Sequence, residues 1–342
     1  MPSRRTFLTT TAATFAGIAA ASPLTALARA ARPLGQNQYF DWTDLGRGLH
    51  VASGGAVGGG GNALLIVGDG EAALIDAKLC GLGPTLRREA ESRLGDDARL
   101  THLISTHHHG DHIGGNPSFG DVTRVGHSNL NPRVMPQIDR LRDTAASIAR
   151  RVAGADAGVP VAMRNDIDAM LEDAKSFIAA DFEMTQTLRD ELELEVGGVR
   201  LQLRHAGPGH TDNDVFIFLP DHNVLHTGDL FFNKLHPYMD IGAGATSRGW
   251  QQSLLNCIQR CDGETVVVPG HGEISNRDGL GEQVKYFDEM RRIIRFARDV
   301  ESMTRDEVTK LQPGRFAEYG NERLLTMNLG AIYDELADEK KQ

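Results

Sequence analysis

The residues best suited to chemistry lie in one short stretch, residues 106–112, which reads Thr-His-His-His-Gly-Asp-His. The apolar run before it, residues 100–105, is typical of a strand that ends in a loop. A loop at a strand end is accessible to ligands and presents side chains at several angles. Neutral imidazole and carboxylate are the ligands that a borderline divalent ion such as Zn²⁺ prefers. The stretch therefore predicts a metal site.

The spacing within this stretch indicates two metal ions rather than one. His107 and His109 are two residues apart, so they share a face in an extended segment. Gly110 allows the backbone to turn before a second pair of potential ligands, Asp111 and His112. A chance surface run of histidines is the alternative, and the specific H-x-H-x-D-H spacing argues against it.

This H-x-H-x-D-H pattern resembles the signature of the metallo-β-lactamase-fold hydrolases. Three later segments resemble the other metal-binding loops of that family: Gly209-His210-Thr211, Gly228-Asp229 at a strand end, and Pro269-Gly270-His271-Gly272. The resemblance covers roughly residues 60–275. It implies a first ion bound by His107, His109 and His210, a second bound by Asp111, His112 and His271, and a bridging Asp229.

The resemblance also implies a reaction. Two zinc ions would lower the pKa of a shared water and give a bridging hydroxide, which attacks an ester, thioester, lactone or related bond of a small substrate. Asp111 would orient this nucleophile as well as bind metal. Iron and manganese accept the same ligands. Asp229 favours a general hydrolase, similar to the glyoxalase II branch, because true β-lactam hydrolases of the family mostly carry Cys or Ser there.

Three other functions remain open at this stage. A β-lactam hydrolase fits the fold, although Asp229 fits it less well. A mononuclear iron oxygenase of the persulfide-oxidising kind would need only the first histidine set and Asp229, and the presence of His112 and His271 argues against it. A non-catalytic metal-binding scaffold would typically have lost ligands, and here every expected position is filled.

Several more residues are candidates for supporting roles or substrate contacts. By resemblance, Asp76 supports the metal loop from the end of an apolar run at 72–75, and His108 is not a ligand but supports the site. The segment between Asp229 and His271 offers cations and donors that could hold a carboxylate or an oxyanion, namely Lys234, His236, Tyr238 and Arg248. The glycine-rich stretch 53–62 lacks the Lys-Ser/Thr of a phosphate-binding loop and is interpreted as a turn or flap near the site.

Strand-like and helix-like segments alternate along the chain, which indicates an α/β layer structure. The resemblance specifies a four-layer αβ/βα sandwich of the metallo-β-lactamase type, spanning about residues 36–300. Apolar residues recur at three and four within 131–188, which predicts a helical insert between two ligand segments. Residues 301–342 are expected to form a helical extension that packs on the same domain.

The first 30 residues resemble a twin-arginine signal peptide. Arg4-Arg5 precede Phe7-Leu8, a mild Ala-rich run follows, and Ala26-Leu27-Ala28 suits a signal peptidase. We therefore expect passage through the twin-arginine export machinery, a periplasmic or otherwise exported location, and no stable membrane span in the mature chain. The 342-residue chain has a formal net charge of −10, which disfavours nucleic acid as a partner.

Overall fold

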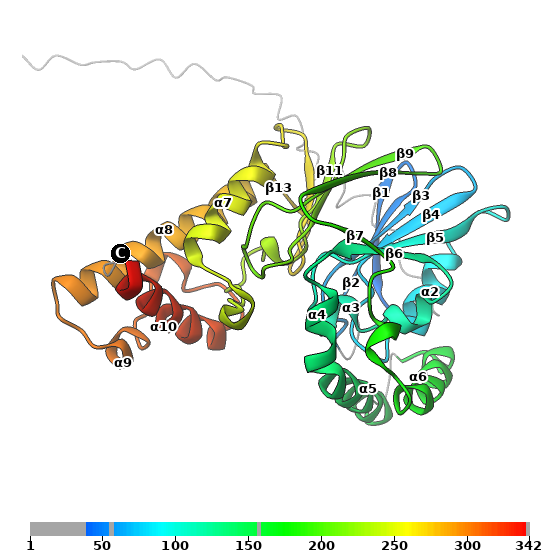
Figure 1. Cartoon of the computed structure of the whole chain (residues 1–342), viewed down its shortest axis with the longest axis horizontal. Coiled ribbons are helices and arrows are strands. Elements are labelled where there is room, and N and C mark those ends of the chain that lie inside the picture. The colour runs from blue at the N-terminus through cyan, green and yellow to red at the C-terminus, as the bar shows by residue number, and fades with distance from the viewer. Residues whose placement is uncertain (1–38, 55–57, 156–158, 340–342) are drawn as a thin grey trace, which may run out of the picture.

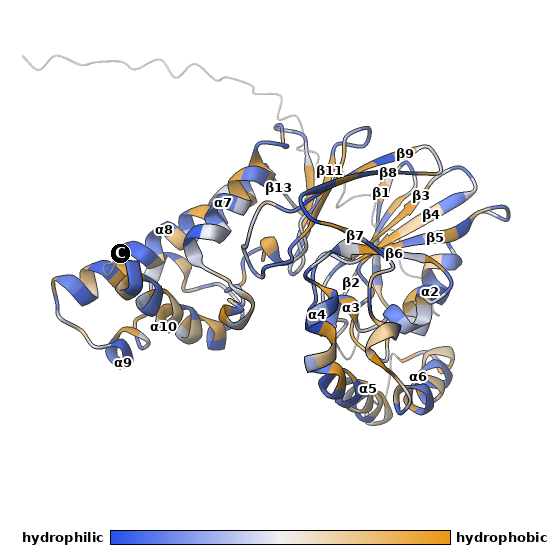
Figure 2. Ribbon diagram, in the orientation of Figure 1, coloured by the Kyte–Doolittle hydropathy of each residue, from blue (hydrophilic) through white to orange (hydrophobic). Residues whose placement is uncertain are grey.

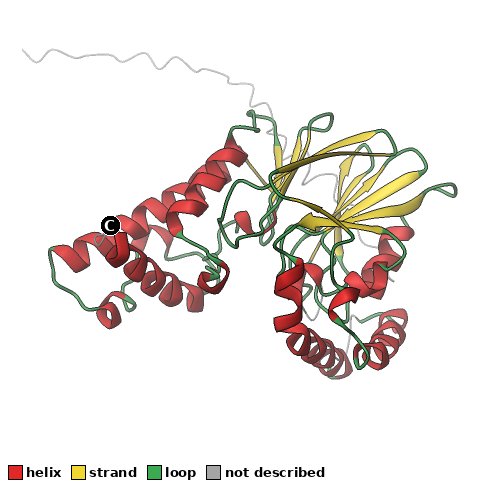
Figure 3. Ribbon diagram, in the orientation of Figure 1, coloured by secondary structure: helices red, strands yellow, loops and turns green. Residues whose placement is uncertain are grey.

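The computed structural model describes residues 39–54, 58–155 and 159–339. The expected signal peptide, residues 1–30, lies outside these ranges. Within them, no helix combines the length and the apolar character that a membrane crossing requires. The described residues form two β-sheets with helices on either side (Figures 1 and 3).

The first sheet has seven strands in the order β1-β2-β3-β4-β5-β6-β7. Their bounds are Asp41–Gly46 (β1), Leu49–Ser53 (β2), Ala63–Val67 (β3), Glu71–Ile75 (β4), Arg99–Ile104 (β5), Thr123–His127 (β6) and Gln186–Leu188 (β7). Strands β1 to β4 pair antiparallel, and β4 to β7 pair parallel. Because β4 and β5 run in the same direction, the loops that follow them leave from one edge of the sheet.

The second sheet has six strands in the order β13-β12-β11-β10-β9-β8. Their bounds are Glu191–Val196 (β8), Val199–Arg204 (β9), Phe216–Leu219 (β10), Val224–His226 (β11), Val266–Val268 (β12) and Ser275–Asn276 (β13). Strand β11 is parallel to β12, and β10 is antiparallel to both β9 and β11. Strands β9, β11 and β12 therefore end at the same edge, and each precedes a segment that carries a predicted ligand.

The two sheets pack face to face, with helices on both outer faces. Alternate residues of β3 show how: Leu64 and Ile66 join the core between the sheets, whereas Leu65 joins the outer core. Both faces of this strand are buried, which explains its continuous apolar sequence. Figure 2 shows hydrophobic residues along the strands. The four-layer sandwich predicted from the sequence is confirmed.

Helices α2 (Gly83–Glu91), α5 (Ile138–Ala153) and α6 (Val161–Ala174) cover the outer face of the first sheet. Helices α7 (Ser247–Ile258), α8 (Arg277–Asp299) and α10 (Glu322–Glu339) lie on the side of the second sheet (Figure 1). Shorter elements complete the fold: α3 (Gly110–Ile113), α4 (Asn131–Val134), α9 (Arg305–Val308), η1 (Asn116–Phe119), η2 (Met135–Gln137), η3 (Ala179–Asp181), η4 (Gly228–Leu230), η5 (Ile241–Ala243) and η6 (Gly314–Phe316).

The segment predicted as a helical insert, 131–188, contains α4, α5 and α6 but ends differently from the prediction. Its last residues form β7, which pairs parallel with β6 and extends the first sheet. Three residues are too few to show a strand period in the sequence. The helices of the segment lie beside the loops that carry His107 and His109, since the Gln137 side chain donates to the His108 carbonyl at 2.7 Å.

The C-terminal helix α10 shares a hydrophobic core with α7, α8 and the second sheet, and one buried arginine adds polar contacts between these helices. Arg291 of α8 is 6% exposed and binds Glu335 of α10 at 2.8 Å and Glu339 at 2.6 Å. The Glu335 carboxylate also accepts from the backbone N–H of Ser247 at 2.8 Å, at the start of α7. One ion pair thus joins three helices.

Replacing Arg291 with alanine is expected to lower the free energy of unfolding by about 3 kcal/mol, because a carboxylate in a largely buried position loses its partner. Urea unfolding of Arg291→Ala measures this. Arg292→Ala is the matched control, since the side chain of Arg292 is 67% exposed in its pair with Glu289, and its cost should stay below about 1 kcal/mol. Equal effects of the two substitutions would contradict the structure.

Candidate metal centre

All the predicted ligands lie at one edge of the sandwich, where the two sheets meet. His107 and His109 follow β5, Asp111 and His112 lie in α3, and the remaining three follow β9, β11 and β12. Backbone hydrogen bonds connect the sheets at this edge. The Val215 N–H donates to the Thr106 carbonyl at 2.7 Å, and the Asn62 N–H donates to the Gly270 carbonyl at 2.7 Å.

Asp76 holds the metal loop against the end of β4. Its φ is +62°, a left-handed conformation that is uncommon for a residue with a side chain. One carboxylate oxygen accepts from the Thr106 N–H at 2.8 Å, and the other lies 2.7 Å from His112 Nδ1. The Thr106 hydroxyl donates to the same carboxylate at 2.8 Å. The structure therefore places Asp76 as a support for the loop, with no direct place among the ligand atoms.

The first cluster contains His107, His109, His210 and Asp229, each with one potential ligand atom within 4.8 Å of the others. His210 Nε2 lies 2.9 Å from His109 Nδ1 and 3.4 Å from Asp229 Oδ2. His107 Nε2 lies 3.7 Å from the same carboxylate oxygen. Ligand atoms bound to one tetrahedral zinc ion are about 3.3 Å apart, so this spacing suits a shared ion.

The second cluster contains Asp111, His112 and His271, each of which also has one potential ligand atom within 4.8 Å of the others. His271 Nε2 lies 3.1 Å from Asp111 Oδ2 and 3.4 Å from Asp229 Oδ1. His112 Nε2 lies 3.0 Å from Asp229 Oδ1. The two oxygens of Asp229 thus face different clusters, which is the arrangement that a bridging carboxylate requires.

The outer nitrogen of each of four histidine rings has a partner, and these partners define which nitrogen carries the proton. His210 Nδ1 donates to the Tyr238 carbonyl at 2.6 Å, and His109 Nε2 donates to the Asp240 carboxylate at 2.9 Å. His112 Nδ1 donates to Asp76, and His107 Nδ1 donates to the Thr106 hydroxyl at 3.0 Å. The other nitrogen of each ring is then an acceptor aimed into the clusters.

In these tautomers the inward nitrogens are acceptors, and they face one another and the oxygens of Asp229. His107 Nε2, His112 Nε2 and Asp229 Oδ1 are buried and make no hydrogen bond among the described residues. Buried polar atoms without a partner are costly, and a cation between them removes that cost. The donor set of imidazoles and carboxylates fits a divalent transition metal.

The electrostatics differ between the two clusters. Burial and the neighbouring His112 lower the pKa of His107 well below its usual value, and burial with His109 lowers the pKa of His210 to about 3. Burial opposes protonation of His271 as well, yet Asp229 and Asp111 raise its pKa to about 9. The same balance of burial against Asp229 raises the pKa of His112. In the first cluster, His107 and His210 thus offer neutral imidazoles, whereas the carboxylates near the second cluster attract positive charge.

Two glycines allow the loops to approach this closely. A Cβ at Gly61 would lie 2.2 Å from Cε1 of His112, and a Cβ at Gly270 would lie 2.0 Å from Oδ1 of Asp229. The end of the glycine-rich stretch therefore lies against the site, although its residues 55–57 are outside the described ranges.

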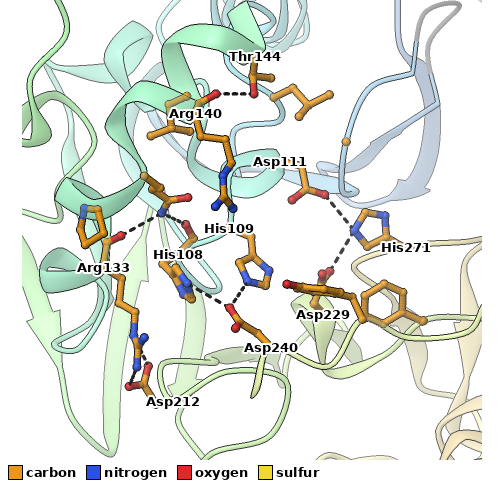
Figure 4. Close-up of a pocket in the computed structure, with 18 of the residues that line it drawn as sticks. His108, His109, Asp111, Arg133, Arg140, Thr144, Asp212, Asp229, Asp240 and His271 are labelled. Atoms are coloured by element: carbon orange, nitrogen blue, oxygen red, sulfur yellow. Dashed lines mark hydrogen bonds and ion pairs between the residues drawn. The ribbon is translucent and has the colours of Figure 1, made fainter. Parts of the chain in front are cut away.

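A pocket of about 1000 Å³ opens over the clusters and is lined by Asp111, Asp229 and His271 (Figure 4). Its opposite wall comes from α4 and α5, including Arg133, Arg140 and Leu141. Ligand-binding sites are commonly concave and combine apolar walls with a few polar groups, as this pocket does.

The other predicted site residues divide into two groups. His108 and Tyr238 line the pocket; His108 Nδ1 accepts from the Asn213 side chain at 3.0 Å, and the Tyr238 ring lies 5.6 Å from that of His109. His108, His109 and Asp240 also lie close enough to hold an ion. However, the bond to Asp240 occupies the nitrogen of His109 that faces away from the first cluster, so we assign this trio a supporting role.

Lys234, His236 and Arg248, which were predicted as substrate contacts, do not line this pocket. The His236 N–H pairs with the Gly320 carbonyl at 2.8 Å. His236 is buried against the Tyr286 hydroxyl at 3.0 Å. Lys234 lines a separate cavity, and Arg248 lies exposed at the start of α7.

Sequence reasoning missed Asp240, Arg133 and Arg140. Asp240 stands in a loop without a motif, so no sequence signal pointed to it. For the arginines a signal existed: a helical insert beside the metal loop presents one face to the site, and cations on that face are candidates for substrate contacts.

Comparisons with known proteins agree with this geometry. A family model described as the metallo-beta-lactamase superfamily matches residues 56–271. The metallo-beta-lactamase type 2 of Bacillus cereus is 26% identical over 181 residues, which are 52% of this chain and 54% of that protein. A linear primary-alkylsulfatase of Pseudomonas sp. (strain ATCC 19151) is 26% identical over 273 residues, 74% of this chain and 44% of that one. The chain thus spans about half the length of these two relatives.

Solved structures show the same fold. The DIM-1 metallo-beta-lactamase superposes with a TM-score of 0.52 at 18% identity, covering 73% of this chain and 97% of that one. The sec-alkylsulfatase Pisa1 from Pseudomonas sp. gives a TM-score of 0.59 at 17% identity, covering 86% of this chain and 50% of that one. The family match over residues 56–271, the four-layer sandwich and the paired His/Asp clusters together show that this chain belongs to the metallo-β-lactamase superfamily.

Proposed function

We propose that the protein is a dinuclear metal-dependent hydrolase, with zinc as the best-fitting ion, that cleaves an ester, thioester, lactone or related bond of a small substrate. One observation carries this proposal. Acceptor atoms of seven residues face each other in two clusters, with Asp229 in contact with both and a pocket directly above. Two divalent ions held there would supply Lewis acidity and lower the pKa of water so that it attacks at neutral pH.

The residues of the chain have separate parts in this scheme. His107, His109 and His210 would hold one ion, and His112, His271 and Asp111 the other, with Asp229 between them. Asp111 is the catalytic residue, because it lines the pocket as well as facing His271. Its carboxylate accepts the proton of the attacking water and returns it to the leaving group, so that the reaction consumes one water and releases an acid and an alcohol or thiol.

Hydrolysis of a sulfate ester or of a β-lactam is the second candidate, supported by the activities for which the two relatives above are named. The alkylsulfatase similarity extends over 74% of this chain, against 52% for the β-lactamase, which favours the sulfate ester. Export through the twin-arginine machinery, with action in the periplasm, is a further proposal that rests on residues 1–30 alone.

The Asp111→Asn variant tests the function. It should retain the fold and reduce kcat by about 10²–10⁴, because positioned acid–base groups contribute on that order. The assay uses zinc-loaded protein with ester, thioester, lactone, sulfate ester and β-lactam substrates. Asp97→Asn, at an exposed loop aspartate, is the control and should match the wild type. An Asp111→Asn enzyme within twofold of wild type at equal metal content would refute the assigned role.

Gly61→Ala tests whether the close contact between the glycine-rich stretch and His112 positions the second cluster. The new methyl would meet the His112 ring at 2.2 Å, so His112 must move and metal content should fall by about one ion per chain after dialysis. Gly95→Ala has open space around its Cβ and should keep full metal content. Metal content is measured by elemental analysis; unchanged content in Gly61→Ala would show that this contact does not position His112.

A further inference from the structure

We infer that Arg140 anchors an anionic group of the substrate, a carboxylate or a sulfate, on the wall of the pocket opposite the metal clusters. This inference rests on the proposed function and adds the class of substrate: a small molecule with a negative charge apart from the bond that is cleaved.

Helix α5 presents one face to the pocket. Arg140, Leu141 and Thr144 all line it, and Gln137 does so one turn earlier. Their spacing of three and four residues places them along one side of the helix. Figure 4 shows the Arg140 side chain directed into the pocket, with its guanidinium toward the region of His109. The Thr144 hydroxyl donates to the Arg140 carbonyl at 2.8 Å, a hydrogen bond between successive turns of the helix.

Arg140 is not balanced by an acid, unlike the neighbouring cation. Arg133 binds both oxygens of Asp212, with its shorter contact at 2.5 Å. Asp240, the other acid on this wall, is engaged by His109 at 2.9 Å and lies 3.6 Å from His108. Across the described residues, the guanidinium of Arg140 has no ion pair or hydrogen bond. It is exposed, and it faces the pocket rather than a protein carboxylate.

The other charged residues around the pocket also leave Arg140 without an acidic partner. Asp111 and Asp229 are part of the clusters, where bound cations would neutralise them. With Arg133 and Asp212 cancelling each other, the remaining protein charges on the lining are Arg140 and Asp240, and Asp240 is directed at the histidines. Two divalent ions would make the pocket strongly positive, so it would attract anions and align them with the free guanidinium.

A guanidinium also suits the ligand chemically. Its planar fork donates two parallel hydrogen bonds to a carboxylate or a sulfate, which an ammonium does not match. The apolar side chains beside it, Leu141 and Leu324, would contact the body of the substrate.

The test measures binding of substrate-like anions to the zinc-loaded, full-length protein by calorimetry. The probes are hexanoate, hexyl sulfate and the neutral hexanamide. Arg140→Gln should weaken binding of at least one anion by about tenfold or more, the effect of losing hydrogen bonds to a charged group, and should leave hexanamide within about twofold. Arg140→Lys should recover part of the affinity. The anion that binds the wild type more tightly identifies the group as carboxylate or sulfate.

Arg150→Gln is the matched control, because Arg150 is an exposed arginine of the same helix that does not line the pocket; it should bind all three probes as the wild type does. Equal affinity of wild type and Arg140→Gln for both anions, or no measurable binding of either anion to the wild type, would overturn the inference. Turnover is a separate readout. A wild-type protein that binds the anions through Arg140 but hydrolyses no member of the substrate panel would refute the proposed function and leave the anion site standing.

Discussion

The metal centre depends on one electrostatic constraint, the close approach of nitrogen and oxygen atoms that are all acceptors once the outer ring nitrogens carry the protons. His109 Nδ1 and His210 Nε2 are 2.9 Å apart, and their outer nitrogens already donate to Asp240 and to the Tyr238 carbonyl. Two lone pairs at this distance repel each other. Only a positive charge between them makes the arrangement favourable, and the same holds at Asp229, whose two oxygens face different clusters.

The rest of the fold keeps these atoms in place. The strands that precede the ligands end at one edge, so the loops converge without long excursions. Asp76 connects the start of the metal loop to His112 and adopts a left-handed backbone to do so. Glycines at 61 and 270 remove the side chains that would otherwise separate the loops. Positioning of this kind, in which partners behind the ligands fix their orientation, is what a metal site requires for a defined geometry.

How much of this could be predicted from the sequence depended on whether a residue belonged to a pattern. The four ligands of the H-x-H-x-D-H stretch were identifiable from their spacing, whereas His210, Asp229 and His271 were identifiable from the family resemblance. The structure brings all seven together. The sandwich followed from the alternation of strands and helices together with the family resemblance. Strand β7 was missed because three residues show no period.

The substrate contacts were less predictable for a physical reason. Lys234, His236 and Arg248 were chosen because they lie between two ligands in the sequence, but the backbone at 235–236 pairs with Gly320 and none of the three side chains lines the pocket. Arg140 lies far from any ligand motif along the chain and reaches the pocket through the packing of α5. Proximity along the chain does not predict proximity in space where a loop pairs with a distant segment.

The central claim is that two ion sites share Asp229, and its most direct test is the metal stoichiometry of two ligand variants. Elemental analysis of zinc-loaded, dialysed protein should give about two ions per chain for the wild type and about one for each of His210→Ala and His271→Ala, because each substitution removes a ligand from a different cluster. A wild-type protein that holds one ion or none, or variants that both retain the wild-type content, would contradict this account.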